Sequence, residues 1–208
     1  MNKVLFWSQP MNVARKLAVC LGLLPLTAAA QFPAITARGP EISVSAGYEY
    51  VHVPLAPTSH VSLNGSDVSL TIDVNASMGI KLDVGYARAA DVLGSGRHAD
   101  LLNYLIGPTV YPVQRRKWAA YTQALIGAAR VTGPVPLVGG TLSTGGYSNK
   151  LAWVVGGGIE HKLSSSLSFR GGADYLHTVY FSPSKTMTGQ GDIRIVGSVV
   201  YTFGGRRR

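Results

Sequence analysis

The chain has 208 residues, a formal net charge of +9 and only 14% charged residues. Three positive charges lie within residues 1–30 and three more end the chain, so the body between them carries about +3 and shows no basic stripe interleaved with aromatics, which argues against nucleic-acid binding. The mean hydropathy is +0.18, yet no stretch after residue 30 holds 18 consecutive apolar residues, which excludes a transmembrane helix and favours alternating strands.

Residues 1–30 have the layout of a cleaved secretory signal peptide. They contain no acidic residue, and Arg15 and Lys16 precede an apolar run of about ten residues that is too short to span a bilayer as a helix. The segment ends in three alanines, so we expect cleavage after Ala30. Met11 offers an alternative start to Met1.

Cys20 is the only cysteine and lies inside the apolar run. Its surroundings loosely resemble a lipoprotein acceptor site, but Val19 is larger than the small residue usual before such a cysteine. We therefore interpret Cys20 as an ordinary signal residue. Cleavage at Ala30 would leave a mature chain without disulfides or cysteine-based zinc sites.

The pattern of residues 41–203 predicts a series of strands. Apolar and polar residues alternate with period two, and segments rich in Gly, Pro, Ser and Asn separate the alternating stretches. The alternation is cleanest over the first two segments, and the Ala-rich fifth segment does not reveal which face is buried. In chain order, the predicted strands span 41–50, 67–76, 80–87, about 100–112, about 118–130, 151–162, 167–175 and 192–203.

The last predicted strand shows the two faces most clearly. Its even positions include Asp192, Arg194 and Ser198, whereas its odd positions are apolar and end in Tyr201 and Phe203. In a soluble sandwich the apolar face would point to a core, but in a transmembrane barrel it faces lipid and the polar face lines the lumen. The secretion signal favours the barrel.

The connections alternate between long and short along the predicted strands. We expect long loops at 52–66, 88–99, 131–149 and 181–191, and tight turns near 77–79, 114–117 and 164–166. Long loops on one rim and tight turns on the other are typical of outer-membrane barrels. Such a barrel must close, because open strand edges cannot be satisfied in lipid.

The predicted inward faces carry charges of both signs. Eight strands leave a lumen only wide enough for side chains to fill, so these charges are expected to pair as a structural plug rather than form an ion pathway. Small inward residues (Gly85, Gly107, Gly156, Gly158 and Gly172) would make room for them. The predicted lumen charges are Glu41, Glu49, Asp73, Lys81, Asp83, Glu160, Arg170, Asp174 and Arg194.

On these features the chain resembles the small eight-stranded outer-membrane barrels of the OmpA/OmpX-like superfamily. The resemblance covers about residues 41–203 and rests on the strand pattern, the segment Ala152–Glu160 and the ending Tyr201-Thr202-Phe203. It implies an all-β, eight-stranded antiparallel up-and-down transmembrane barrel. The ending is similar to the signal read by the barrel-assembly machinery, although the basic tail 204–208 follows Phe203 where the family usually ends.

An enzymatic alternative is a rim hydrolase similar to the lipid A deacylases. His60 and Ser62 have a His-x-Ser spacing, but they lie in the first predicted loop rather than near the end of the barrel, and no glutamate on an adjacent hairpin could orient the histidine. His52, His98 and His177 lie near the same predicted rim without metal-ligand spacing. We therefore expect no catalytic site, metal or cofactor.

The sequence thus predicts a non-enzymatic outer-membrane barrel with a plugged polar interior and long extracellular loops, serving envelope structure, adhesion or binding. Expected partners are outer-membrane lipid, lipopolysaccharide and, during biogenesis, the barrel-assembly machinery; we expect no nucleic acid and a monomer. A narrow channel and a soluble lipocalin-like barrel remain alternatives. Residues predicted to form interfacial aromatic girdles are Tyr48, Tyr50, Tyr86, Trp118, Trp153, Tyr175, Tyr201 and Phe203.

Overall fold

The computed structural model describes residues 41–56, 59–92, 94–133, 135–136, 142–143, 148–178 and 190–203. The predicted signal peptide 1–30 and the basic tail 204–208 lie outside the described residues. Within the described ranges, no helix has the length and apolar character needed to cross a bilayer.

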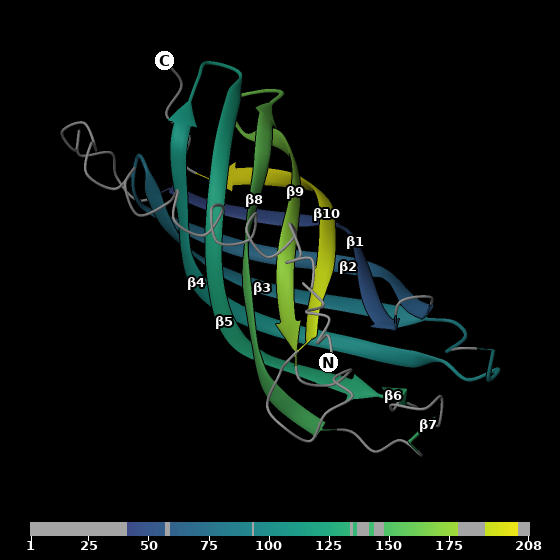
Figure 1. Ribbon diagram of the computed structural model, residues 1–208. Coiled ribbons are helices and arrows are strands. Elements are labelled where there is room, and N and C mark those ends of the chain that lie inside the picture. Colours follow the sequence, from purple (N-terminus) through teal and green to yellow (C-terminus); the bar gives the residue numbers. More distant parts are fainter. Residues whose placement is uncertain are drawn as a thin grey trace, which may run out of the picture. The chain divides into compact units, whose positions relative to one another are not determined.

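Eight of the strands form one closed antiparallel barrel, and two short ones pair separately within the connection from β5 to β8 (Figure 1). The barrel strands follow one another around the ring in chain order, and β1 closes it against β10. The strands are β1 (Glu41–Ala56), β2 (Ser59–Asn75), β3 (Met78–Ala89), β4 (Ala99–Gln114), β5 (Trp118–Thr132), β6 (Val135–Pro136), β7 (Leu142–Ser143), β8 (Ser148–Lys162), β9 (Leu167–Thr178) and β10 (Gln190–Phe203).

Closure is made by a continuous register between the first and last strands. Ile42 pairs with Phe203 at one end of this seam, and His52 pairs with Ile193 at the other. The predicted eight-stranded antiparallel up-and-down barrel is therefore confirmed. It has no open edge, so every strand has hydrogen-bonding neighbours on both sides.

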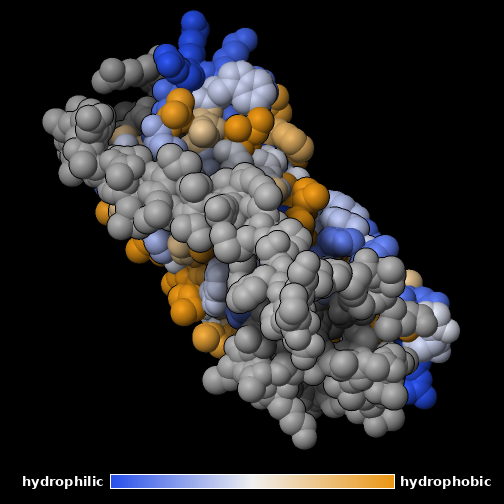
Figure 2. Space-filling view, viewed as in Figure 1, coloured by the Kyte–Doolittle hydropathy of each residue, from blue (hydrophilic) through white to orange (hydrophobic). Residues whose placement is uncertain are grey.

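The apolar faces of the strands point outward. Ile72, Val84 and Phe169 are 41%, 49% and 51% exposed, whereas Asp83 and Arg170 are 0% and 4% exposed. Figure 2 shows hydrophobic side chains on the visible part of the barrel wall. A soluble ligand-binding barrel has the reverse arrangement, so the lipocalin-like alternative is wrong for this chain.

The Ala-rich strand β5, whose facing the sequence left open, is resolved by its larger residues. Tyr121, Gln123 and Leu125 are buried in the lumen, while Thr122 and Ile126 point outward. Alanine fits either face, so it is the bulkier residues between the alanines that distinguish the two.

The predicted long loop at 52–66 is wrong. β1 continues to Ala56 and β2 begins at Ser59, so both strands extend well past the expected boundary. Pro54 is tolerated because the register shifts beside it. Gly65, which lies within that predicted loop, instead pairs with Ala87 on β3, and a Cβ on Gly65 would come 1.7 Å from the carbonyl oxygen of Tyr86.

The remaining connections fall close to their predicted places. β3 and β4 are separated by 90–98, and β5 and β8 by 133–147, which contains the small β6–β7 sheet. The tight turns lie at 76–77, 115–117 and 163–166, and 179–189 fall outside the described residues. The barrel strands are 12 to 17 residues long, which is more than the roughly 9–11 residues that a tilted bilayer crossing needs.

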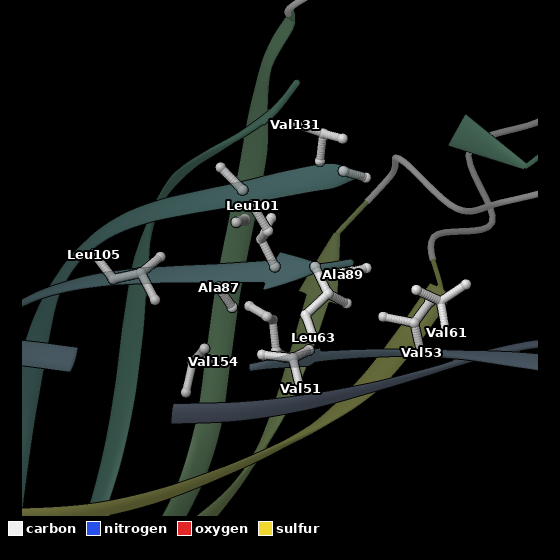
Figure 3. Packing of buried hydrophobic residues seen from close by; sticks show 14 of the residues in the cluster. Val51, Val53, Val61, Leu63, Ala87, Ala89, Leu101, Leu105, Val131 and Val154 are labelled. Carbon is white, nitrogen blue, oxygen red and sulfur yellow. The ribbon is translucent and has the colours of Figure 1, made fainter. Parts of the chain in front are cut away.

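The interior has a different character at each level. Buried aliphatic side chains from several strands meet near the ends that carry the longer connections, and we call this group the apolar core (Figure 3). Charged residues fill the middle, and a polar cavity opens at the tight-turn end. The apolar core comprises Val51, Val53, Val61, Leu63, Ala87, Ala89, Val92, Ala99, Leu101, Leu105, Leu125, Ala129, Val131, Ala152, Val154 and Leu176.

Candidate functional site

Arg194 lies at the centre of the barrel and joins three strands to its own. Its side chain is 0% exposed, and its Nη2 lies 2.9 Å from Asp83 Oδ2 and 2.8 Å from Asp174 Oδ2. Its Nη1 lies 3.4 Å from Glu49 Oε2. One guanidinium thus ties β10 to β9, β3 and β1, because its fork of donors can reach several carboxylates at once.

Neutral amides and Lys81 extend this group into a network. Lys81 Nζ lies 3.1 Å from Asp83 Oδ2 and donates to Gln123 Oε1 at 3.3 Å. Gln123 in turn donates to Asp174 Oδ1 at 2.9 Å, and Asn103 donates to Glu49 Oε1 at 3.3 Å. We call Arg194, Glu49, Asp83, Asp174, Lys81, Gln123 and Asn103 the ionic cluster.

A second buried pair lies closer to the tight turns. Arg170 donates to Glu160 Oε2 through Nε at 3.1 Å and through Nη2 at 2.7 Å. The same Nη2 donates to the hydroxyl of Tyr111 at 3.1 Å, and the guanidinium lies 5.0 Å from the ring centre of Tyr121. Paired and held over an aromatic ring, this charge is compensated within the lumen.

Two of the inward glycines make room for the charged side chains. A Cβ on Gly85 would lie 2.2 Å from Glu49 Oε2, and one on Gly156 would lie 2.2 Å from Asp174 Oδ1. Gly107 differs from the prediction, because its nearest neighbour is the backbone oxygen of Ala124 at 2.1 Å.

The polar cavity at the tight-turn end has a volume of about 810 Å³, and we call it the vestibule. Arg170 and Glu160 lie at its inner end, and the turns at 115–117 and 163–166 contribute to its mouth. Asp73 also lines it; this side chain is only half-buried, and its Oδ1 has no hydrogen-bond partner among the residues that the structure describes.

The nine predicted lumen charges thus separate into two groups, and Glu41, at the start of β1, belongs with those that line the vestibule. Glu49, Lys81, Asp83, Asp174 and Arg194 meet in the ionic cluster, whereas Asp73, Glu160 and Arg170 line the vestibule. The two residues predicted as the assembly signal, Tyr201 and Phe203, point outward with their ring centres 4.8 Å apart.

The rim residues considered for catalysis lie on the outer face of β2. The hydroxyl of Ser62 lies 2.9 Å from the hydroxyl of Tyr50, and the ring centre of His60 lies 5.0 Å from that of His52. Within the described part of the chain, no hydrogen bond or ion pair joins His60 or Ser62 to a carboxylate, so the geometry does not assemble a nucleophile, base and orienting acid. Among the described residues, no group of three or more His, Cys, Asp or Glu is arranged to hold a metal.

Several interior residues were not singled out as lumen charges or partners from the sequence. Asp67 and Asp192 are 0% exposed, and their place on the polar faces of alternating strands was the signal that could have found them. Tyr111 and Gln123 contact the charged groups, but they lie on β4 and β5, where the alternation is irregular. Most of the apolar core was missed because positions such as Val53, Leu63 and Val92 fell in predicted loops, and Leu125 and Ala129 fell in the fifth segment, whose facing was not clear.

Aromatic and histidine side chains gather on the outer wall at two levels. Near the longer connections, the ring centre of Trp153 lies 5.6 Å from that of Tyr175 and 4.8 Å from that of His177. At the tight-turn end, the ring centres of Trp118 and His161 lie 4.0 Å apart. This arrangement fits the two interfacial girdles of a membrane barrel.

No protein-family model matches the chain, and no curated protein matches it. Among solved structures, Neisserial surface protein A is similar with a TM-score of 0.60 and 12% identity, over 80% of this chain and 100% of that one. The attachment invasion locus protein Ail of Yersinia pestis (TM-score 0.56, 14% identity) and a major outer membrane protein of Thermus thermophilus (0.55, 14%) match over the same shares. The chain therefore has the fold of the small eight-stranded outer-membrane β-barrels.

Proposed function

We propose that this protein is a non-enzymatic outer-membrane barrel whose interior is closed to solutes and whose longer connections contact the cell exterior. The observation that carries this proposal is the filled lumen: the apolar core lies between the ionic cluster and the end of the barrel that carries the longer connections. A solute would have to displace packed aliphatic side chains and then separate buried ion pairs. The role is then one of envelope structure, adhesion or binding.

The outer rim supports contact with lipopolysaccharide. Arg88 extends from the lipid-facing side of β3, next to Tyr86 and beside the longer connections, and its side chain is 48% exposed. Its Nε lies 3.2 Å from Asp100 Oδ1, which also accepts a hydrogen bond from the hydroxyl of Tyr86 at 2.9 Å. A guanidinium held at this level suits the phosphates of an anionic lipid. We also propose that the assembly machinery reads Tyr201 and Phe203.

Fractionation combined with a gel-mobility assay tests the location. The protein should be recovered with the outer membrane and should migrate differently before and after boiling. Recovery in the soluble periplasm would contradict the proposal.

Planar-bilayer recording tests the closed interior. The purified protein should give little or no conductance, because eight strands leave a lumen that side chains fill. Reproducible single-channel steps would favour the channel alternative instead. A comparison of lipid A from cells with and without the protein addresses the hydrolase alternative, and a changed acyl pattern would contradict a non-enzymatic role.

The name of Ail, the attachment invasion locus protein, assigns that protein to attachment. The scaffold shared with it is compatible with a surface-binding role for the present chain. Binding of labelled cells expressing the protein to host-matrix components would test that role, with cells lacking the gene as the control. Equal binding by both cell types would argue for a purely structural function.

A further inference from the structure

The vestibule carries opposite charges on opposite sides of its mouth. Glu41 on β1 and Asp73 on β2 are direct register partners and form its acidic side. Lys117 and Lys162 form the basic side together with Arg116. In the ring of eight strands, the β1–β2 pair and the β5–β8 pair stand diametrically opposite each other.

Both sides are held in place by the fold. The backbone N–H of Lys162 donates to the carbonyl of Lys117 at 2.8 Å, which fixes the end of β8 against the β4–β5 turn. On the acidic side, a Cβ on Gly79 would come 2.5 Å from Asp73 Oδ1, so the missing side chain leaves the space that the carboxylate occupies. The charges are therefore built into the ends of the strands and their turns.

The inner end of the vestibule is closed and locally neutral. Glu160 and Arg170 compensate each other there at 2.7 Å, and both are less than 10% exposed. Among the residues that the structure describes, Asp73 on one side of the mouth and Lys117 and Lys162 on the other are then charges that a ligand in the vestibule would meet. A purely anionic solute would be repelled by the acidic side, and a purely cationic solute by the basic side.

We propose that the vestibule binds a small dipolar ion, with its ammonium group toward Asp73 and its carboxylate or phosphate toward Lys117 and Lys162. Free amino acids and short peptides have this chemistry, and the cavity of about 810 Å³ is large enough to admit them. The site lies at the tight-turn end, which faces the periplasm in barrels of this type. The inference is independent of the proposed function, which concerns the closed lumen and the opposite rim.

The site is tested by adding small ligands to the protein and monitoring its backbone amide signals by NMR. The protein is held in an uncharged maltoside detergent, so that no lipid headgroup competes for the site. The probes are 4-aminobutyrate and glycylglycine, compared with butyrate and butylammonium as single-charge halves. We expect saturable shifts at Ser43, Asp73 and Ser164, and no shift at Val92 near the other end. Butyrate and butylammonium should each bind at least roughly tenfold more weakly than 4-aminobutyrate, because each lacks one of the two charge-assisted contacts.

Two variants and two matched controls locate the binding. Asp73→Asn and Lys117→Gln should each weaken the binding of 4-aminobutyrate by roughly tenfold. Asp91→Asn and Lys150→Gln make the same chemical changes near the longer connections and should leave the affinity for 4-aminobutyrate unchanged. Retained heat-dependent gel mobility shows that each variant is folded.

Three results would overturn the inference. One is the absence of saturable shifts with either dipolar probe. Another is binding of butyrate or butylammonium as tight as that of 4-aminobutyrate, which would indicate a simple ion pair. The third is unchanged affinity in both Asp73→Asn and Lys117→Gln.

Discussion

Replacing Arg194 with methionine should be among the most damaging single changes to the barrel. The substitution removes the cation shared by Glu49, Asp83 and Asp174, whose side chains are 0%, 0% and 2% exposed. Removing one partner from a buried pair costs about 3–5 kcal/mol, because the remaining charge stays in a low-dielectric site. Glu49 and Asp174 lose their cation here and Asp83 keeps only Lys81, so we expect a loss of at least about 3 kcal/mol in unfolding free energy.

Arg88→Met is the matched control, because it makes the same chemical change at an exposed ion pair. The side chains of Arg88 and Asp100 are 48% and 23% exposed, and such surface pairs contribute about 0–1 kcal/mol. Urea unfolding in lipid vesicles, followed by tryptophan fluorescence and gel mobility, measures both variants. The unfolding constant of Arg194→Met should exceed that of Arg88→Met by roughly a hundredfold, since about 1.4 kcal/mol corresponds to a factor of ten.

A rescue variant separates electrostatics from packing. Adding Glu49→Gln and Asp174→Asn to Arg194→Met removes two of the stranded charges and leaves Asp83 with Lys81, 3.1 Å away. At least half of the lost stability should return. If Arg194→Met unfolds within about 1 kcal/mol of Arg88→Met, or if the added neutral amides restore nothing, the electrostatic reasoning is refuted.

Five further substitutions, one of which is a control, test other positions of the barrel. Gly85→Ala should cost about 1–3 kcal/mol in vesicle unfolding, because its Cβ would lie 2.2 Å from Glu49 Oε2, and Arg194 and Asn103 hold that carboxylate in place. Gly171→Ala, with no atom within 4 Å of the added carbon, should be neutral. Leu63→Ala removes a fully buried side chain from the apolar core and should cost about 2–5 kcal/mol in the same assay; an unchanged midpoint would mean that the core contributes little. Leu82→Arg places a charge on the lipid-facing wall and should destabilise the vesicle-bound barrel by about 2 kcal/mol or more. If the variant were as stable in urea as the unchanged protein, this prediction would be wrong. Phe203→Ala should slow assembly in cells, seen as a smaller heat-modifiable fraction, without changing the in vitro unfolding midpoint.

Period-two alternation predicted the strands and their two faces, and the predicted secretion signal and the loop asymmetry together favoured a barrel with its apolar face outward. Ile72 and Asp73, neighbours in sequence, lie on opposite faces as the pattern indicates. Which carboxylate would meet which cation was not predictable. The pairing depends on how the strands are staggered around the ring, which sets the level at which Arg194 meets the carboxylates of β9, β1 and, across the lumen, β3.

The failure at 52–66 shows where local signals are overridden. Asn64-Gly65 is a strong turn signal in a short segment. Here the strand continues through it, since Val61 and Leu63 are buried in the apolar core and the close approach of the Tyr86 carbonyl requires glycine. Burial and close backbone packing, both set by distant parts of the chain, decided the outcome.

The position of the apolar core has a consequence for how this protein can diversify. It lies between the ionic cluster and the segments that join the strands at that end, so the determinants of folding are separated from the sequence that meets the surroundings. Insertions or exchanges between β9 and β10 would leave the buried contacts of Leu176 and Arg194 in place. The scaffold can therefore tolerate changes of length and composition in these connecting segments without losing its buried contacts, and it is equally suited to the insertion of foreign peptides there.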